Sequence, residues 1–348
     1  MISILKEYPQ MFVTSLISVS LALALPASSP TLKKLPDGPT VIAHRGASGY
    51  LPEHTLEAYA MAHAMNAHYI EPDLVLTKDG ELVALHDRTL DTTTNVKEIY
   101  PTRAREDGRY YAIDFTVTEL KKLEVTERFR LETGELYFKN RFPKNFKVGQ
   151  TIPTLREIIH FVRGLNISSG KVTGIYAELK NPSWHAEQGG RIERTFLEIL
   201  NSENVKPEDG LFIIQCFEHE TLRKLRNEYQ TKLPLVQLIG DNLEVYGWMT
   251  KPEGLKDIAT YADGVGPTYD LIIDKETGGV LDENLFVKTA HELGLKVHPY
   301  TLRSDSLPKW ASSFDQLVQK LFVEVGVDGA FTDQTDKLIQ SLRQLKKL

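Results

Sequence analysis

The sequence is poor in cysteine and lacks concentrated basic charge. Its 348 residues contain one cysteine, Cys216, so no disulfide can form within the chain and a large apolar core must stabilise the fold. Lys and Arg number 41 against 47 Asp and Glu, and no long basic run occurs, which argues against a nucleic-acid-binding protein. Because Cys216 lies in the apolar run 211–217, we expect a buried small side chain there rather than a reactive thiol.

Two phosphate-binding signatures are also missing. Neither G-x-G-x-x-G nor G-x-x-x-x-G-K-[ST] follows the first strand-like run. A doubly wound nucleotide-binding sheet is therefore the less favoured of two α/β architectures. There is no low-complexity block or evident internal repeat, and 41% hydrophobic with 25% charged residues is the composition of a globular protein. The length suits one large domain or two of medium size.

The N-terminus has the features of a secretory signal peptide. Lys6 precedes an uncharged run over 11–25, which contains the A-x-A pattern Ala22–Ala24. The alternative is a single membrane anchor, but the run is shorter than the roughly 20 residues that a spanning helix needs. We therefore expect a signal peptide over 1–24 and a Pro- and Ser-rich leader over 25–39. The mature protein is then periplasmic or secreted, with no stable membrane span.

Strand-like and helix-like segments alternate along the rest of the chain. The apolar runs of strand length cover 40–43, 69–77, 81–86, 174–180, 211–217, 234–240, 262–267, 296–302 and 329–333. The second and third runs, joined by Lys78-Asp79-Gly80, form one hairpin unit, so eight strand units alternate with about eight helices. This pattern predicts an α/β fold, a (β/α)8 TIM barrel over 40–348. The aperiodic region of about 88–150 is interpreted as an insertion that caps one barrel face, with one helix over 118–129.

Acidic residues stand at predicted strand ends. Glu71 and Asp73 are two residues apart, so a regular strand points both side chains to the same face, and Glu178 stands near the end of a later strand. Pro72 between them removes a ladder donor, which predicts that its strand ends or lies at an edge there. Since the carboxyl ends of barrel strands share one rim, the three carboxylates should meet. Their oxygens suit Ca²⁺ or Mg²⁺ rather than Zn²⁺.

Two histidines at strand ends are candidates for proton transfer. His44 and His86 each stand next to a charged residue, and an imidazole can donate or accept a proton near neutral pH. Hydrolysis of a diester needs one group to assist the nucleophile and another to protonate the leaving alkoxide. Arg45 and Lys180 are candidate phosphate contacts. Most of the histidines on predicted helices or loops are interpreted as ordinary surface residues; they are His54, His63, His68, His160, His185, His219 and His291.

Seven short motifs carry a resemblance to a known family. They are His44-Arg45-Gly46, Glu53-His54-Thr55, Glu71-x-Asp73, His86-Asp87, Glu178-x-Lys180, Gln215-x-Phe217 and Phe331-Thr332-Asp333. In this order they resemble the glycerophosphodiester phosphodiesterase family, most of all its exported bacterial form. The resemblance implies a TIM barrel, a divalent cation (Ca²⁺ in the exported branch), and hydrolysis of small-molecule glycerophosphodiesters to an alcohol and sn-glycerol 3-phosphate.

The resemblance also implies a role for each candidate residue. It maps acid/base catalysis to His44 and His86 and phosphate contacts to Arg45 and Lys180. The metal ligands that it implies are Glu71, Asp73 and Glu178. One departure is His54, because many family members carry Asn at that position.

Two other functions remain open at this stage. One is a phospholipase D-like enzyme acting on (lyso)phospholipids, although the polar insertion offers no obvious membrane-binding helix. The other is a non-catalytic surface binding protein built on the same barrel, although every proposed catalytic position keeps a competent residue. The sequence also does not choose between water and a neighbouring substrate hydroxyl as nucleophile, or between a monomer and a homodimer.

Overall fold

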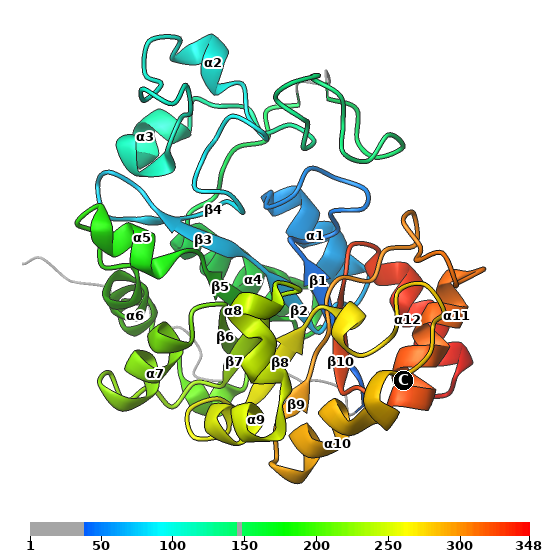
Figure 1. Ribbon diagram of the computed structural model, residues 1–348. Coiled ribbons are helices and arrows are strands. Elements are labelled where there is room, and N and C mark those ends of the chain that lie inside the picture. The colour runs from blue at the N-terminus through cyan, green and yellow to red at the C-terminus, as the bar shows by residue number, and fades with distance from the viewer. Residues whose placement is uncertain (1–37, 145–147) are drawn as a thin grey trace, which may run out of the picture. The chain divides into compact units, whose positions relative to one another are not determined.

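Eight parallel strands form a ring in the structure, a computed structural model that describes residues 38–144 and 148–348 (Figure 1). The strands are β1 (Thr40–His44), β2 (Tyr69–Glu71) continued by β3 (Asp73–Leu76), β5 (Gly174–Leu179), β6 (Phe212–Cys216), β7 (Leu235–Ile239), β8 (Gly264–Pro267), β9 (Lys296–Val297) and β10 (Gly329–Thr332). Backbone bonds from Phe331 N to Pro299 O (3.0 Å) and from Leu302 N to Phe331 O (2.8 Å) join the last two strands. The predicted TIM barrel is therefore confirmed, whereas the predicted signal peptide and most of the leader lie outside the described residues.

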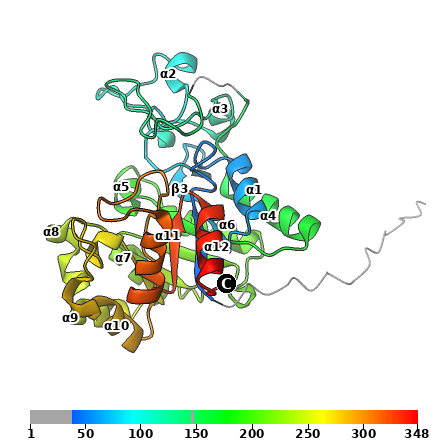
Figure 2. The ribbon, with the colours of Figure 1, turned by 90° about the vertical axis from the view of Figure 1, so that its right-hand side faces the viewer.

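Helices surround the ring in both ribbon views (Figures 1 and 2). They are α1 (Leu56–Ala64), α4 (Leu155–Ser169), α5 (Pro182–Glu187), α6 (Ile192–Ser202), α7 (His219–Asn227), α8 (Leu243–Tyr246), α9 (Pro252–Ile258), α10 (Leu285–Glu292), α11 (Phe314–Gln319) and α12 (Thr335–Gln344). The longest, α4, begins at a capping box of Thr154 and Glu157 and ends at Gly170, whose positive φ suits glycine. Among the described residues, no helix combines the length and the hydropathy that crossing a membrane requires.

Pro72 interrupts a barrel strand without ending it. Both β2 and β3 pair with β5 in continuous register, and Glu178 N donates to Pro72 O at 2.9 Å. On the other side the strand changes neighbour, because β2 pairs with β1 whereas β3 pairs antiparallel with β4 (Leu82–Ala84). The hairpin is therefore confirmed. The expectation is confirmed in part: the segment β2 ends at Glu71, but the barrel strand continues from Asp73 as β3 in the same register against β5. The proline lies where the strand exchanges one partner for another.

The barrel core holds the lone cysteine, as predicted. Cys216 is fully buried and its thiol lies 3.3 Å from Leu179 O, so it packs as a small core residue. Inside the ring, Tyr176 and Phe331 pack edge to face with ring centroids 5.2 Å apart. The larger apolar layer lies between strands and helices and includes the predicted α4 face of Leu155, Ile158, Ile159 and Val162.

The predicted insertion lies over one end of the barrel and has a small apolar core of its own (Figure 2). Its helices are short, α2 (Val96–Ile99) and α3 (Val117–Leu120). The expected helix over 118–129 is wrong in extent. After α3 the chain becomes extended, because Val125 N donates to Gln150 O and Thr126 N to Thr93 O, each at 2.8 Å. Pairing with distant segments therefore replaces the helical hydrogen bonds that the local sequence favours.

Candidate active site

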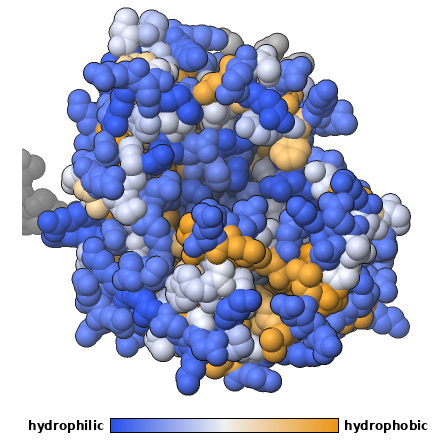
Figure 3. Space-filling model, viewed as in Figure 1, coloured by the Kyte–Doolittle hydropathy of each residue, from blue (hydrophilic) through white to orange (hydrophobic). Residues whose placement is uncertain are grey.

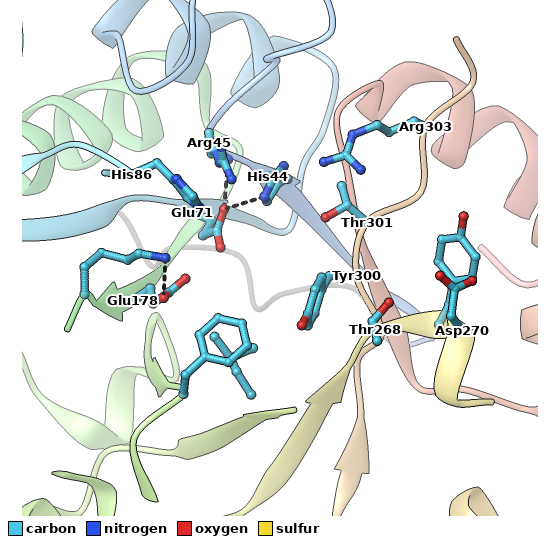
Figure 4. Close-up of a pocket in the computed structure, with 14 residues that line it drawn as sticks. His44, Arg45, Glu71, His86, Glu178, Thr268, Asp270, Tyr300, Thr301 and Arg303 are labelled. Atoms are coloured by element: carbon cyan, nitrogen blue, oxygen red, sulfur yellow. Dashed lines mark hydrogen bonds and ion pairs between the residues drawn. The ribbon is translucent and has the colours of Figure 1, made fainter. Parts of the chain in front are cut away.

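A cavity of about 260 Å³ opens at the carboxyl ends of the strands (Figure 4). Six of the seven candidate site residues line it: His44, Arg45, Glu71, His86, Glu178 and Lys180. The seventh, Asp73, lies behind them and is 1% exposed. Residues that the sequence separates by more than a hundred positions are thus brought to a single rim. The expectation that strand ends converge is confirmed.

Three carboxylates form the centre of the site. Glu71, Asp73 and Glu178 each offer an oxygen, and these oxygens lie within 4.8 Å of one another. Strand register places them, since Asp73 pairs with Glu178 across β3 and β5, and Glu71 pairs with His44 across β2 and β1. Both acidic residues flanking Pro72 belong to this one cluster, as the two-residue spacing predicts.

The electrostatics of this cluster suit a bound cation. Burial, followed by the charges of Asp73 and Glu178, raises the pKa of Glu71 well above its usual value. Burial also raises the pKa of Glu178 to about 8. Burial acts to raise the pKa of Asp73 too, but Lys180 and His54 outweigh it and hold that pKa well below its usual value. Adjacent buried carboxylates repel one another, and a divalent cation would relieve that repulsion.

Unpartnered oxygens point to the same conclusion. Asp73 Oδ1 and Gln215 Oε1 are buried, and neither has a hydrogen-bond partner among the residues that the structure describes. Gln215 Nε2 meanwhile donates to Glu71 Oε1 at 2.7 Å and so fixes the orientation of that carboxylate. Buried polar atoms in folded proteins nearly always have partners, so free acceptors beside three carboxylates fit a hard cation. The residues present therefore suit Ca²⁺ or Mg²⁺.

Each candidate catalytic histidine is paired with a carboxylate. His44 Nδ1 lies 2.6 Å from Asp333 Oδ1, and His86 Nδ1 lies 2.7 Å from Asp87 Oδ1. A carboxylate that accepts from Nδ1–H leaves Nε2 free to accept a proton. His44 Nε2 lies 4.0 Å from Glu71 Oε2, so this nitrogen is directed to the carboxylate cluster.

Burial keeps both imidazoles neutral near pH 7. It lowers the pKa of His44 to about 4, with Arg45 adding to the effect and Asp333 opposing it. It lowers the pKa of His86 to about 3, with Arg45 and Lys180 adding to the effect. A neutral imidazole can act as a general base, and the conjugate acid that it forms can then protonate a leaving group.

Two cationic side chains complete the cavity wall. Arg45 has a positive φ of 58°, which turns the chain after β1, and its N–H donates to Glu71 Oε2 at 2.9 Å. Lys180 Nζ lies 2.7 Å from Glu178 Oε1. Burial acts to lower the pKa of Lys180, but Glu178 and Asp73 raise it overall, so the lysine stays charged. Both cations line the cavity, and Figure 4 shows Arg45 there beside His44 and Glu71. An anionic phosphate entering the cavity would meet both charges.

The prediction of surface positions was wrong for four histidines. His54, His63, His68 and His185 are each at most 6% exposed. His54 supports the site, because Nε2 lies 2.9 Å from Asp73 Oδ2 and Nδ1 lies 3.0 Å from Tyr59 Oη. The sequence signal that could have assigned His54 to the site was its place in the Glu53-His54-Thr55 motif. The error has a physical cause, since helix and loop periodicity does not report polar partners contributed by other segments.

Sequence reasoning placed some partners of the site residues without giving them a role. Asp87, Gln215 and Asp333 belong to the quoted motifs and stand at strand ends, but the pattern did not assign Asp87 and Asp333 to the histidines or Gln215 to Glu71. Arg128 and Arg141 come from the aperiodic insertion, and they bond Asp87 and Asp333 respectively. No local pattern marks those two arginines.

Three clustered carboxylates, two histidine–carboxylate pairs and two cationic side chains at the mouth of one barrel form the arrangement expected of a metal-dependent phosphoester hydrolase. The model of the glycerophosphoryl diester phosphodiesterase family matches residues 44–337. The chain is 38% identical over 331 residues to the glycerophosphodiester phosphodiesterase of Haemophilus influenzae, with 88% of this chain and 90% of that protein covered. It is 34% identical over 319 residues to the one of Treponema pallidum, covering 85% and 89%.

Solved structures show the same fold. A phosphodiesterase from Oleispira antarctica, in complex with the product sn-glycerol-3-phosphate, matches with a TM-score of 0.62 at 21% identity, covering 88% of this chain and 97% of that one. A glycerophosphodiester phosphodiesterase from Thermotoga maritima matches with a TM-score of 0.54 at 20% identity, covering 86% and 96%. The chain therefore belongs to the glycerophosphoryl diester phosphodiesterase family. Members of this family depend on a divalent metal, for which the carboxylate cluster is suited.

Proposed function

We propose that this protein hydrolyses glycerophosphodiesters to an alcohol and sn-glycerol 3-phosphate. The observation that carries the proposal is the placement of two neutral, carboxylate-paired histidines beside one three-carboxylate cluster in a single cavity. Family membership supports the reaction, and the product named for the Oleispira antarctica structure supports the substrate class. The rival reading as a non-catalytic binding protein has no such support.

The site residues divide the work of the reaction between them. Arg45 and Lys180 hold the phosphate oxygens, with the arginine able to contact two oxygens at once. Glu71, Asp73 and Glu178 would hold the divalent cation, which polarises the phosphoryl group when bound. One histidine, neutral at the start, takes a proton from the nucleophile. The other must enter the step as the imidazolium, which the negative charge of a bound phosphate favours, in order to give a proton to the leaving alkoxide. Water and a neighbouring substrate hydroxyl both fit this scheme.

A cation-supplemented assay with glycerophosphocholine tests the proposal. Release of sn-glycerol 3-phosphate is expected in the presence of Ca²⁺, and chelation should abolish it reversibly. Phosphorus NMR of the reaction distinguishes the nucleophiles, because attack by a substrate hydroxyl gives a cyclic phosphate first. If the purified protein releases no glycerol 3-phosphate with any divalent cation, the proposal is wrong.

Calcium is the cation that we propose for this chain. The three carboxylates and the oxygen of Gln215 supply only hard oxygen donors, which is the donor set that Ca²⁺ prefers. Mg²⁺ uses the same donors but demands a tighter octahedral arrangement. Titrating the metal-free protein with each ion, using glycerol 3-phosphate release as readout, ranks the two cations. A higher affinity and rate with Mg²⁺ would reverse the assignment.

An apolar rim favours a second candidate activity, phospholipase D-like cleavage of lysophospholipids. Leu243, Val245 and Trp248 are 61%, 52% and 40% exposed. The neighbouring Tyr246 packs on Phe217, which lines the cavity, with ring centroids 5.9 Å apart. Hydrophobic surface therefore borders the hollow at the cavity opening, on the side where α8 lies (Figure 3). A rim of this kind could cover an acyl chain. Comparing turnover of glycerophosphocholine with that of lysophosphatidylcholine separates the two activities.

Export and oligomeric state are separate parts of the proposal. The sequence pattern over 1–39 supports export with cleavage near residue 24, and N-terminal sequencing of the protein from a periplasmic extract tests this. All seven candidate site residues meet within one chain. The homodimer therefore stays a prediction for sedimentation analysis.

A further inference from the structure

Both histidine–carboxylate pairs end on an arginine of the insertion. The first chain of contacts runs from His44 through Asp333 to Arg141, and the second runs from His86 through Asp87 to Arg128. In each case the histidine occupies one carboxylate oxygen and the arginine bonds the other. The insertion therefore touches both sides of the catalytic centre through the same arrangement.

Arg141 is held so that its guanidinium cannot turn away from Asp333. Its Nη2 donates to Asp333 Oδ2 at 2.7 Å, and its Nε donates to Asp305 Oδ2 at 2.8 Å. Its Nη1 donates to Ser48 O at 3.3 Å, and its side chain is 4% exposed. Arg303 Nε also donates to Asp333 Oδ2, at 2.6 Å. Asp333 thus bonds three groups, two of them cations.

Arg128 serves His86 and Arg45 together. Its Nη1 donates to Asp87 Oδ2 at 2.5 Å, and its Nη2 donates to Glu53 Oε1 at 2.6 Å. Glu53 in turn accepts from Arg45 Nη1 at 3.0 Å through its other oxygen. The Arg128 side chain is 14% exposed. One insertion residue therefore holds the partner of a catalytic histidine and the partner of the phosphate-facing arginine.

We propose that Arg128 and Arg141 are positioning residues, through which the insertion fixes the orientation of both catalytic histidines. A carboxylate bonded at both oxygens holds its imidazole in one orientation. The second oxygen of Asp333 also accepts from Arg303 at 2.6 Å and that of Asp87 from the Thr92 hydroxyl at 2.9 Å, so each insertion arginine shares this role with one further donor. Neither arginine lines the cavity, so neither is placed to touch the substrate. The inference rests on the proposed hydrolysis, because its readout is the turnover of a glycerophosphodiester.

The insertion also supplies a matched control. Arg109 donates to Asp91 Oδ2 and Oδ1 at 2.7 and 2.8 Å, and the Asp91 side chain is fully buried. Its Nη2 also donates to Thr89 Oγ1 at 2.7 Å, and Thr89 too lies outside the cavity lining. Removing Arg109, whose side chain is 36% exposed, therefore costs the insertion an ion pair to a buried carboxylate without breaking a hydrogen bond to Asp87 or Asp333.

The experiment compares Arg141→Ala, Arg128→Ala and Arg109→Ala with the parent enzyme at saturating cation. For Arg141→Ala, in which Arg303 still bonds Asp333 Oδ2, we expect kcat to fall between about tenfold and 10²-fold with KM changed less than about threefold, since geometry rather than binding is lost. Arg128→Ala should lower kcat and also raise KM, because Arg45 loses its support. Arg109→Ala should keep kcat within about twofold. Millimolar guanidinium should restore part of kcat to Arg141→Ala and none to His44→Ala.

Each of these results either supports or contradicts the positioning role of the two arginines. Parental kcat in folded Arg128→Ala and Arg141→Ala would overturn it, as would an equal loss in Arg109→Ala, which would mean that the insertion acts only through its stability. If the alanine variants do not fold, Arg128→Lys and Arg141→Lys keep a cation but not the guanidinium fork. These should show parental melting temperatures with kcat lowered about tenfold, and parental kcat would again overturn the inference. Absence of turnover in the parent enzyme would instead contradict the proposed function.

Discussion

His54 Nε2 lies 2.9 Å from Asp73 Oδ2, so a histidine outside the cavity lining fixes the most buried carboxylate of the metal cluster. Tyr59 Oη lies 3.0 Å from the other ring nitrogen and fixes the imidazole in turn. The bond leaves Asp73 Oδ1 without a partner, which is the oxygen that a cation would use. A residue behind a ligand can thus determine how that ligand is presented.

Replacing His54 should therefore weaken cation binding. For His54→Ala we expect an activity-based cation titration to shift to roughly 10–100-fold higher concentration, the usual effect of losing the partner of a ligand. At saturating cation the rate should return close to the parental one. His63→Ala is the control, because His63 is equally buried but bonds Thr173 and Ser169 instead. An unchanged titration for His54→Ala would contradict the supporting role.

The two catalytic histidines should be separately essential. His44→Ala and His86→Ala should each lower kcat by about two to four orders of magnitude with glycerophosphocholine at saturating cation, because each loses one proton-transfer group. Circular dichroism and the melting temperature establish that the variants are folded. If either variant keeps near-parental kcat, that histidine does not transfer the proton assigned to it.

Cation binding should stabilise the protein measurably. Since the cation relieves repulsion among three buried carboxylates, it binds the folded chain in preference to the unfolded one. At 100 times its Kd it should contribute about 2.7 kcal/mol to the free energy of unfolding. Calorimetry with and without Ca²⁺ should show the rise in melting temperature. Glu71→Gln should abolish that rise while leaving the cation-free protein at least as stable as the parent, and a full rise in Glu71→Gln would exclude Glu71 as a ligand.

Glu127 predicts a pH dependence of stability. Burial raises its pKa to about 8 in the folded protein, with the charge of Glu53 adding to the effect. Within the described part of the chain, its Oε2 has no hydrogen-bond partner. The folded chain therefore keeps a proton that the unfolded chain loses above its ordinary pKa of about 4.5. The contribution of Glu127 to stability accordingly decreases as pH rises between about 4.5 and 8.

Glu127→Gln should remove that pH dependence. Urea midpoints in the presence of saturating cation should be similar for parent and variant near pH 5, with the variant more stable near pH 8.5. Saturating cation holds the metal ligands ionised, so they do not contribute to the comparison. A difference in midpoint that stays constant across this range would show that Glu127 does not titrate there.

The sequence predicts the barrel and the inner residues of the site for one physical reason. Parallel strands with helical crossovers place every strand end on one rim, so polar residues at those ends must converge. His44, Glu71 and Glu178 could therefore be assigned to one site before any coordinates were known. The two-residue spacing of Glu71 and Asp73 similarly determined their common direction.

The outer contacts could not be predicted in this way. Arg141 bonds Asp333, which lies 192 positions later in the sequence, and the local sequence pattern of the insertion does not indicate that contact. The helix predicted over 118–129 fails for a related reason, since Gln150 and Thr93 supply backbone partners for its second half. Pairing between irregular segments that are distant in the sequence depends on the folded structure, whereas sequence periodicity indicates only the local preference for helix or strand.

The change of partner at Pro72 has a consequence for how the metal site is built. Against β5 the register runs on unbroken past the proline, so Glu71, Asp73 and Glu178 are spaced by backbone hydrogen bonds of a single strand pair. The ligand oxygens would therefore already lie at the separation that a bound ion needs. Little of the backbone would have to become ordered when the ion binds. The selectivity of the centre for one ion radius over another is accordingly a property of the sheet, and loop substitutions around the rim should leave it unaltered.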